Sequence, residues 1–361
     1  MMSEVYFAHV QTSNSLLYDL ERLFDKAFPD IIKKGDLTAI KMHFGELGNT
    51  AFIKSIYVKT VVGKVKSIGA NPFLTDSNTL YRHKRHNAVD HLQTAVHNGF
   101  TYATVGAPII IADGLHGHSH KQIEINKKYF KTVKIGEAIA EADSIIALSH
   151  FKGHMSAGFG GCIKNLSMGC ASRAGKQQQH SSTKPKINTT KCIKCRKCGE
   201  ICPEEAIDYA RGYAEIDYKK CVGCDECVTV CPTEAIAIRW DTSGKKEMQE
   251  KMVEYAYGAV KDKRAGFINF LLDITPDCDC FPKSDAPIVP NIGILASLDP
   301  VAIDQASLDL VNQQTGLVGS RLKHTGSKNK FKDIHGFTNT YQLEYAEQIN
   351  LGSRKYKLIK I

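Results

Sequence analysis

The chain has 361 residues, of which 43% are hydrophobic and 24% are charged, so it can bury a large core in one or two domains. The formal net charge of +9 indicates acidic partners or phosphorylated ligands, and the lack of an aromatic-basic pattern argues against nucleic-acid binding. No apolar run is long enough to span a membrane and no secretory signal opens the chain, so we predict a cytoplasmic protein without a membrane partner.

Short apolar runs alternate with amphipathic stretches over the first 150 residues, and the alternation returns after residue 241. This pattern predicts strands at residues 5–10, 37–42, 71–76, 108–113, 144–149, 266–274 and 291–297. It predicts helices at residues 16–28, 52–69, 88–99, 135–143, 245–262 and 299–316, the last with Asp299 as N-cap and Pro300 in its first position. We therefore expect an α/β fold, with a largely parallel sheet and flanking helices.

A cysteine-rich segment at residues 186–240 interrupts this alternation between polar, turn-rich flanks. It divides the α/β host domain into two parts, residues 1–185 and 241–361. The pattern C-x2-C-x2-C-x3-C-P occurs twice within it, and "EAI" follows each copy. Such a repeat is typical of a small ferredoxin-like α+β insert that holds two 4Fe-4S clusters.

Three closely spaced thiolates can bind three corners of an iron–sulfur cube, and the fourth ligand then comes from the other repeat, because the chain turns away at the proline. The first predicted ligand set is Cys192, Cys195, Cys198 and Cys231, and the second is Cys221, Cys224, Cys227 and Cys202. Zinc is the alternative metal, but it prefers separated cysteine pairs. The clusters would carry single electrons, although a purely structural role is the alternative.

Polar or ionisable side chains follow most of the predicted strands. In open α/β sheets, ligands bind beyond the carboxyl ends of the strands, so we expect these side chains to gather at one edge. They are His43, Asp76, Asn78, Arg82, Arg85, Asp113, His116, His118, His150, Lys152, His154, Cys278, Cys280 and Asp299.

A glycine-rich loop with Gly158, Gly160 and Gly161 leads from a predicted strand toward Lys164 and Asn165. Glycines allow backbone turns that expose amide groups, so this segment could cradle an anionic substrate or cofactor. It matches neither the dinucleotide nor the P-loop pattern, and a tight loop packed on the sheet is the alternative.

Four cysteines remain once the predicted cluster ligands are subtracted: Cys162, Cys170, Cys278 and Cys280. All four are expected at the pocket edge of the sheet. Cys278 and Cys280 are one residue apart, and three interpretations remain open for them. They could bind a metal ion with Asp277, Asp279, His150 or His154, they could be a redox dithiol fed by the clusters, or they could pack in a core.

Five stretches together resemble the domain-of-unknown-function 362 family, in particular its branch with a ferredoxin insert. They are "IKMHFGELGNT", "PFLTDSNTLY", "SHFKGHMSAGFGGCIKNLSMGCASRAGK", "ITPDCDC" and "LASLDPVAIDQAS". The resemblance covers nearly the whole chain, and it implies the fused architecture and two 4Fe-4S clusters. It implies no particular reaction.

These features lead to the hypothesis of an oxidoreductase with an unknown substrate. Electrons would pass through the clusters to a pocket in which Cys278, Cys280, His150 and His154 are the catalytic candidates. A redox partner protein and an anaerobic setting are expected, because exposed four-iron clusters are oxygen-sensitive. A flavin in the pocket would convert single-electron transfer into two-electron chemistry, although no flavin motif is present. The alternative is an electron carrier or a metal or cofactor maturation protein with no reaction of its own.

Overall fold

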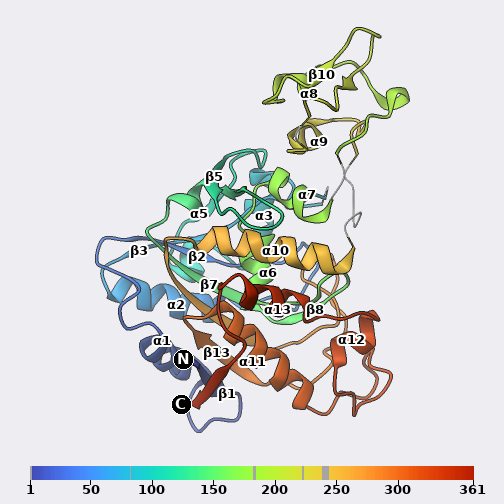
Figure 1. Cartoon of the computed structure of the whole chain (residues 1–361). Coiled ribbons are helices and arrows are strands. Elements are labelled where there is room, and N and C mark those ends of the chain that lie inside the picture. The colour runs from blue at the N-terminus through green and yellow to red at the C-terminus, as the bar shows by residue number, and fades with distance from the viewer. Residues whose placement is uncertain (1, 82, 182–183, 222, 238–243) are drawn as a thin grey trace.

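Eight strands form one mixed sheet in the computed structural model of the chain (Figure 1). The structure describes residues 2–81, 83–181, 184–221, 223–237 and 244–361. Across the sheet the order is β14 (Tyr356–Lys360), β1 (Ser3–His9), β13 (Gly293–Ser297), β12 (Arg264–Leu271), β7 (Ser144–His150), β2 (Leu37–Lys41), β3 (Asn71–Asp76) and β4 (Ile109–Ile111). Pairs that include β13 are antiparallel and the other pairs are parallel, which confirms the predicted α/β class.

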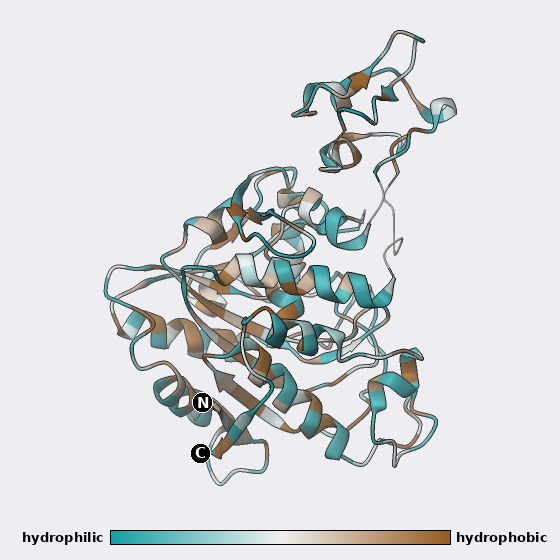
Figure 2. Ribbon diagram, viewed as in Figure 1, coloured by the Kyte–Doolittle hydropathy of each residue, from teal (hydrophilic) through white to brown (hydrophobic). Residues whose placement is uncertain are grey.

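Side chains alternate between the two faces of the sheet, as the pleat of a strand requires. On β7, Ile145 and Ala147 belong to one hydrophobic cluster, whereas Ile146 and Leu148 belong to another. The helices α1 (Leu16–Ala27) and α2 (Ser55–Ser67), with residues of α3 (Ala88–His97) and α4 (Tyr102–Val105), cover the second of these faces. The first face is covered by α5 (Glu137–Glu141), α6 (Cys162–Ser167), α10 (Lys245–Val260), α11 (Pro300–Gln313), α12 (Lys330–His335) and α13 (Tyr341–Gln348). Hydrophobic residues accordingly run along the strands (Figure 2).

The predicted helix after the last sheet strand begins as expected. Asp299 caps α11, since its Oδ1 accepts hydrogen bonds from the backbone N–H groups of Val301 and Ala302 at 2.8 and 2.9 Å, and Pro300 occupies the first helical position. The expectation that Asp299 joins the pocket was wrong. Because β13 runs antiparallel to β12, the carboxyl end of β13 lies at the opposite edge of the sheet.

Smaller elements that the alternation did not predict surround the sheet. They are the hairpin of β5 (His120–Glu124) and β6 (Thr132–Gly136), the hairpin of β8 (Lys152–His154) and β9 (Gly158–Gly160), and the helix α7 (Arg173–His180). The first hairpin replaces part of the helix predicted at residues 135–143, of which only α5 forms.

The cysteine-rich segment forms a small unit that stands apart from the host sheet, above α7 in the view of Figure 1. It contains the short helices η1 (Thr189–Lys191), α8 (Lys197–Glu200) and α9 (Glu226–Val230) and the two-stranded pair of β10 (Ile207–Asp208) and β11 (Glu215–Ile216). A separate hydrophobic cluster lies inside this unit, and Ile187 and Ile236 form an antiparallel bridge. The last three residues of the predicted 186–240 insert lie outside the described residues. No helix in the described parts of the chain is long and apolar enough to cross a membrane.

Candidate functional site

A cavity of about 440 Å³ lies at the carboxyl ends of β2, β3 and β7. This is where ligands bind in open α/β sheets. Cationic and polar groups and two cysteines line it, together with an apolar side made by methionines. Its lining includes Lys41, His43, Asp76, Arg85, His150, Lys152, His154, Lys164, Asn165, Lys176, Cys278, Cys280, Met155, Met168, Met248 and Met252.

Cys278 and Cys280 form an asymmetric pair in this cavity. A hydrogen bond between the two thiol groups is the main cause that lowers the pKa of Cys280 well below its usual value and raises that of Cys278. The sulfur of Cys280 is therefore the one that ionises more readily, and Cys278 holds its proton more tightly. Cys278 is buried, whereas Cys280 is only partly buried.

His43 supplies a second donor to Cys280. The backbone N–H of Gly45 donates to Nδ1 of His43 at 2.9 Å, so the neutral imidazole carries its proton on Nε2. That nitrogen lies 3.5 Å from Sγ of Cys280. Burial, followed by the nearby Arg85 guanidinium, lowers the pKa of His43. His43 therefore acts as a neutral donor to the thiolate.

Lys164 places a positive charge beside the thiol pair. Burial alone would lower its pKa, but Cys280, Cys278 and Asp279 outweigh burial, so the pKa of Lys164 is raised. Its charge in turn helps to lower the pKa of Cys280. A cation next to a thiolate also favours an anionic ligand in the cavity.

Asp279, between the two cysteines, anchors the loop that carries them. Its carboxylate lies 2.9 Å from Nδ1 of His150 and 3.3 Å from Nζ of Lys152, and all three residues are buried. Its backbone carbonyl accepts a hydrogen bond from the N–H of Glu46 at 2.9 Å. Although burial raises the pKa of Asp279, His150 and Lys152 hold it well below its usual range.

The two histidines predicted as catalytic both line the cavity, with different partners. The Nδ1 atom of His150 faces Asp279, and its Nε2 atom faces the carbonyl of Leu272 at 2.9 Å. Both nitrogens are thus occupied, which makes His150 an anchor for the cysteine loop. In His154, Nδ1 accepts from the backbone N–H groups of Ser156 and Ala157, so its neutral ring carries the proton on Nε2. Burial lowers the pKa of His154 well below its usual value.

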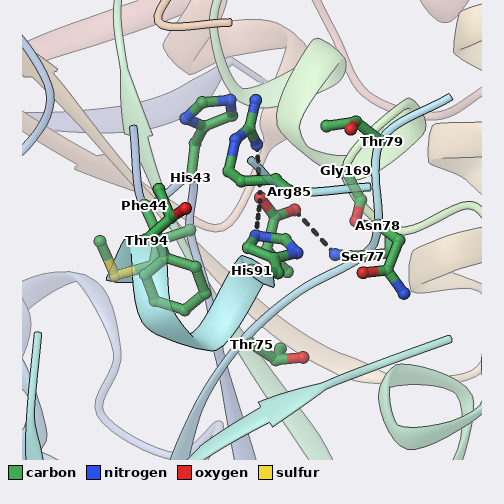
Figure 3. Close-up of polar contacts among 12 residues, drawn as sticks. His43, Phe44, Thr75, Ser77, Asn78, Thr79, Arg85, His91, Thr94 and Gly169 are labelled. Atoms are coloured by element: carbon green, nitrogen blue, oxygen red, sulfur yellow. Dashed lines mark hydrogen bonds and ion pairs between the residues drawn. The ribbon is translucent and has the colours of Figure 1, made fainter. Parts of the chain in front are cut away.

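A buried carboxylate at the end of β3, that of Asp76, also lines the cavity and gathers cationic side chains. Asp76 lies 3.1 Å from Nζ of Lys41, 3.5 Å from a guanidinium nitrogen of Arg85 and 3.8 Å from Nε2 of His91. The N–H of Ser77 donates to it at 2.9 Å (Figure 3). Burial raises its pKa, but Lys41 and its other cationic neighbours hold the pKa well below the usual range.

Glu46 completes this network, and sequence reasoning missed it. Its carboxylate lies 3.2 Å from Nε of Arg85, and both side chains are buried. Arg85 also donates to the hydroxyl of Tyr81. Glu46 follows β2 by only a few residues, so its place after a strand was the signal that could have found it. Arg82, a predicted pocket residue, lies outside the described residues.

Lys176 reaches the cavity from α7. Its Nζ atom donates to Oγ of Ser77 and to the carbonyl of Ala171, each at 2.6 Å. Burial lowers its pKa to about 8. Burial also raises the pKa of the nearby Asp113 to about 7, and this carboxylate accepts hydrogen bonds from both the backbone and the side chain of Asn78.

The glycine-rich loop does not present free amides to the cavity. The amides at the start of α6, those of Cys162 and Ile163, donate to the carboxylate of Asp304 at 2.7 and 2.9 Å. A Cβ atom on Gly161 would lie 2.3 Å from that carboxylate. The chain's own Asp304 therefore takes the place of the expected external anion, and burial raises its pKa to about 6.

Close packing explains the other two glycines of the loop. Gly158 has a φ of +81°, and a Cβ atom there would lie 2.1 Å from Cβ of Asn339. A Cβ atom on Gly160 would lie 2.9 Å from the side chain of Lys164. None of the three predicted glycines is among the residues that line the cavity.

Asn165 lines the cavity and holds two strand ends together. Its Oδ1 atom accepts from Nζ of Lys41 at 2.6 Å, and its Nδ2 atom donates to the carbonyl of Leu148 at 3.0 Å. Its amide groups thus have protein partners, which gives it a positioning role.

The other two cysteines outside the insert were expected at the pocket edge, and this was wrong. Cys162 and Cys170 are fully buried in the hydrophobic cluster on the α10 face of the sheet. Burial raises the pKa of both thiols, that of Cys170 to about 11. They are inert packing residues in this state.

The eight cysteines of the insert gather in two sets of four around two small cavities. One cavity is lined by Cys202, Cys221, Cys224 and Cys227. The other is lined by Cys192, Cys195, Cys198 and Cys231. Among the described residues, in the insert and elsewhere, no three or more His, Cys, Asp or Glu side chains are grouped closely enough to hold a metal ion.

This α/β protein has a cavity at its strand ends and a cysteine-rich insert, and its sequence matches a known protein family. Residues 38–309 match the family described as Domain of unknown function (DUF362). The chain belongs to this family, which agrees with the resemblance seen in its sequence. No curated protein matches the chain.

Two solved structures resemble the chain at low identity. The lactate racemase apoprotein from Thermoanaerobacterium thermosaccharolyticum shares 13% identity with a TM-score of 0.39, and the match covers 75% of this chain and 51% of that one. A structural-genomics crystal structure from Thermotoga maritima shares 8% identity with a TM-score of 0.38, and the match covers 73% of this chain and 51% of that one. The chain thus spans about half the length of these solved structures.

Proposed function

We propose that the chain is an iron–sulfur oxidoreductase in which two 4Fe-4S clusters in the insert deliver electrons to the Cys278–Cys280 pair. The observation that carries the proposal is the pair of Cys278 and Cys280 in a cavity at the strand ends, where Nε2 of His43 lies 3.5 Å from Sγ of Cys280 and the pKa of Cys280 is lowered. Apolar packing alone would not place an ionised sulfur beside Lys164 and an imidazole N–H donor.

The arrangement of the insert supports the cluster part of the proposal. Each four-cysteine set combines three cysteines of one repeat with the fourth of the other. The backbone N–H of Ala206 points at Sγ of Cys202 at 3.3 Å, and that of Ile236 points at Sγ of Cys231 at 3.4 Å. Hydrogen bonds to the sulfurs are typical of cluster sites. In a four-iron cluster each cysteine binds a different iron, so its ligands spread wider than those of a single ion.

Bound clusters would supply single-electron transfer. The thiol pair supplies the two-electron step. When Cys280 and Cys278 form an S–S bond, the pair releases two electrons and the proton of Cys278. An anionic two-electron acceptor in the cavity would take up these electrons. Two further electrons and one proton return the pair to its thiol and thiolate forms.

The cationic groups of the cavity support an anionic substrate. The ammonium group of Lys164 forms no hydrogen bond or ion pair within the described residues, and the charges of Cys280, Cys278 and Asp279 act on it. The ring of His154 adds a neutral N–H donor on the cavity wall. The methionines Met168, Met248 and Met252 give the substrate an apolar side to pack against.

Anaerobic purification followed by iron, sulfide, thiol and heat-release analysis tests the proposal. We expect iron and sulfide for two four-iron clusters, and a count of reactive thiols that rises when the protein receives electrons from a low-potential donor. The heat-released fraction also shows whether a flavin or an additional metal accompanies the thiols. Cys162→Ser is the matched control, because this cysteine is buried in the core.

The variants Cys278→Ser and Cys280→Ser separate the enzyme from an electron carrier or maturation protein. Each should abolish the electron-dependent change in thiol count while cluster content stays the same. If both variants keep that change, or if no iron and sulfide are bound, the proposal fails. If wild-type thiols never respond to electrons, the chain is a carrier.

A further inference from the structure

The two cysteine loops of the insert carry opposite charge. Residues 191–198 contain Lys191, Lys194, Arg196 and Lys197 and no acidic residue. Residues 221–227 contain Asp225 and Glu226 and no lysine or arginine. Repeats with the same cysteine spacing thus present different surfaces to their surroundings.

The two acidic residues of the second loop are buried, and Glu226 contacts the host domain. Glu226 lies 2.6 Å from Nζ of Lys134, which also donates to the carbonyl of Cys224 at 3.2 Å. One guanidinium nitrogen of Arg173 donates to the carbonyl of Thr229 at 3.0 Å. Glu226 and Thr229 are both buried as a result. Helix α9 is therefore the side of the insert that docks on the host, as Figure 1 shows.

This contact also joins the insert to the cavity. Helix α7 begins with Arg173, which contacts α9, and its residues Lys176 and His180 line the cavity. The cysteine set with Cys224 and Cys227 consequently lies on the host side of the insert. The set with Cys195 and Cys198 lies around α8, which Figure 1 shows farther from the host.

The basic loop is open to solvent. Lys191, Lys194, Lys197 and Cys195 are exposed, and Ile193 is 62% exposed. Among the described residues, no carboxylate forms an ion pair with these three lysines. An exposed cysteine and an isoleucine among lysines without ion pairs resemble the composition of a protein interface with an apolar centre and a polar rim.

We propose that the loop of residues 191–198 is the docking surface for an acidic single-electron carrier protein. Docked there, the carrier meets the cysteine set of Cys192, Cys195, Cys198 and Cys231, and the host meets the other set. Charge selects the carrier, because the same loop would repel a basic protein. The inference rests on the proposed function for its electron route, although the docking itself can be measured separately.

The test compares Lys191→Gln/Lys194→Gln/Lys197→Gln with Lys323→Gln/Lys328→Gln/Lys332→Gln, which removes three exposed lysines elsewhere. Arg196 stays unchanged, because its guanidinium lies 5.4 Å from the ring centroid of Tyr209 and helps to pack the loop. The probe is an acidic plant-type [2Fe–2S] ferredoxin. Affinity is measured at low and high ionic strength, together with the rate at which the reduced probe reduces the protein.

In the loop variant we expect affinity and rate at low ionic strength to fall about tenfold to a hundredfold, with most of the salt dependence lost. The control variant should match the wild type, and a photoreduced deazaflavin should reduce both variants equally. Equal affinity of the loop variant and the wild type would overturn the inference. Iron and sulfide content decides the proposed function separately, because the probe's affinity is measured whether or not clusters are present.

Discussion

Replacing Cys278 with alanine tests the central chemical feature of the cavity, the thiolate of Cys280. The S–H group of Cys278 is the main cause that lowers the pKa of Cys280, ahead of Lys164 and His43. A hydrogen bond to a charged group contributes about 1.5–3 kcal/mol. Since about 1.4 kcal/mol corresponds to a factor of ten, Cys278→Ala should lower the acid dissociation constant of Cys280 about tenfold to a hundredfold.

The assay is the pH dependence of alkylation by iodoacetamide, followed by mass spectrometry of the peptide that contains Cys280. The midpoint of the profile should lie at higher pH in Cys278→Ala than in the wild type, because only the thiolate reacts. Cys278→Ser is the matched control, since its hydroxyl can still donate, and its midpoint should stay near that of the wild type. Equal midpoints for the alanine variant and the wild type would refute the assignment of Cys278 as donor.

Three further predictions concern the anchor, the glycine loop and the insert. Asp279→Asn should lower the free energy of unfolding at pH 7 by about 3–5 kcal/mol in urea denaturation, because it leaves the buried ammonium of Lys152 without a carboxylate partner, whereas Asp277→Asn should cost less than about 1 kcal/mol. The pKa of Asp279 lies below its ordinary value of 3.8, so its stabilising contribution is present above that pH and the difference should vanish as pH falls through the acid range. Gly158→Ala should lower the thermal midpoint of unfolding clearly more than Gly336→Ala. Gly336 is the control because its φ of +77° is similar but a Cβ atom there would have no neighbour within 4 Å. Equal losses in the two variants would contradict the packing role of Gly158. Lys134→Gln should raise amide hydrogen exchange in α9 about tenfold or more, because Glu226 loses a buried partner, and unchanged exchange would argue against the docking described above.

Most strands of the sheet could be predicted from the sequence, because each buried strand is a short apolar run. β3 coincides with its predicted range, and β2 and β7 differ by one residue. Chain direction was the missing information. The apolar pattern of a strand does not reveal its direction in the sheet. Nothing in residues 291–297 therefore showed that β13 is antiparallel, and Asp299 was predicted at the wrong edge.

The residues of the cavity could be predicted where they follow parallel strands or the glycine-rich loop. His43, Asp76 and His150 lie at or just after strand ends, and the cysteine pair follows β12 by several residues. Lys164 and Asn165 follow the glycine-rich loop and also line the cavity. Contacts that depend on three-dimensional packing could not be found in this way. The pairing of Glu46 with Arg85 joins residues 39 positions apart. Asp304 reaches the amides of α6 from a helix more than a hundred residues away.

Asp279 connects the loop of the cysteine pair to the sheet through its hydrogen bonds and ion pairs. Its carboxylate ties the loop to β7 and β8 through His150 and Lys152, and its carbonyl ties the loop to the segment after β2. A bond between the neighbouring sulfurs would pull directly on this tethered residue. In the proposed reaction, formation of that bond would therefore be felt at the ends of β7 and β2, which Asp279 joins to the cysteine loop.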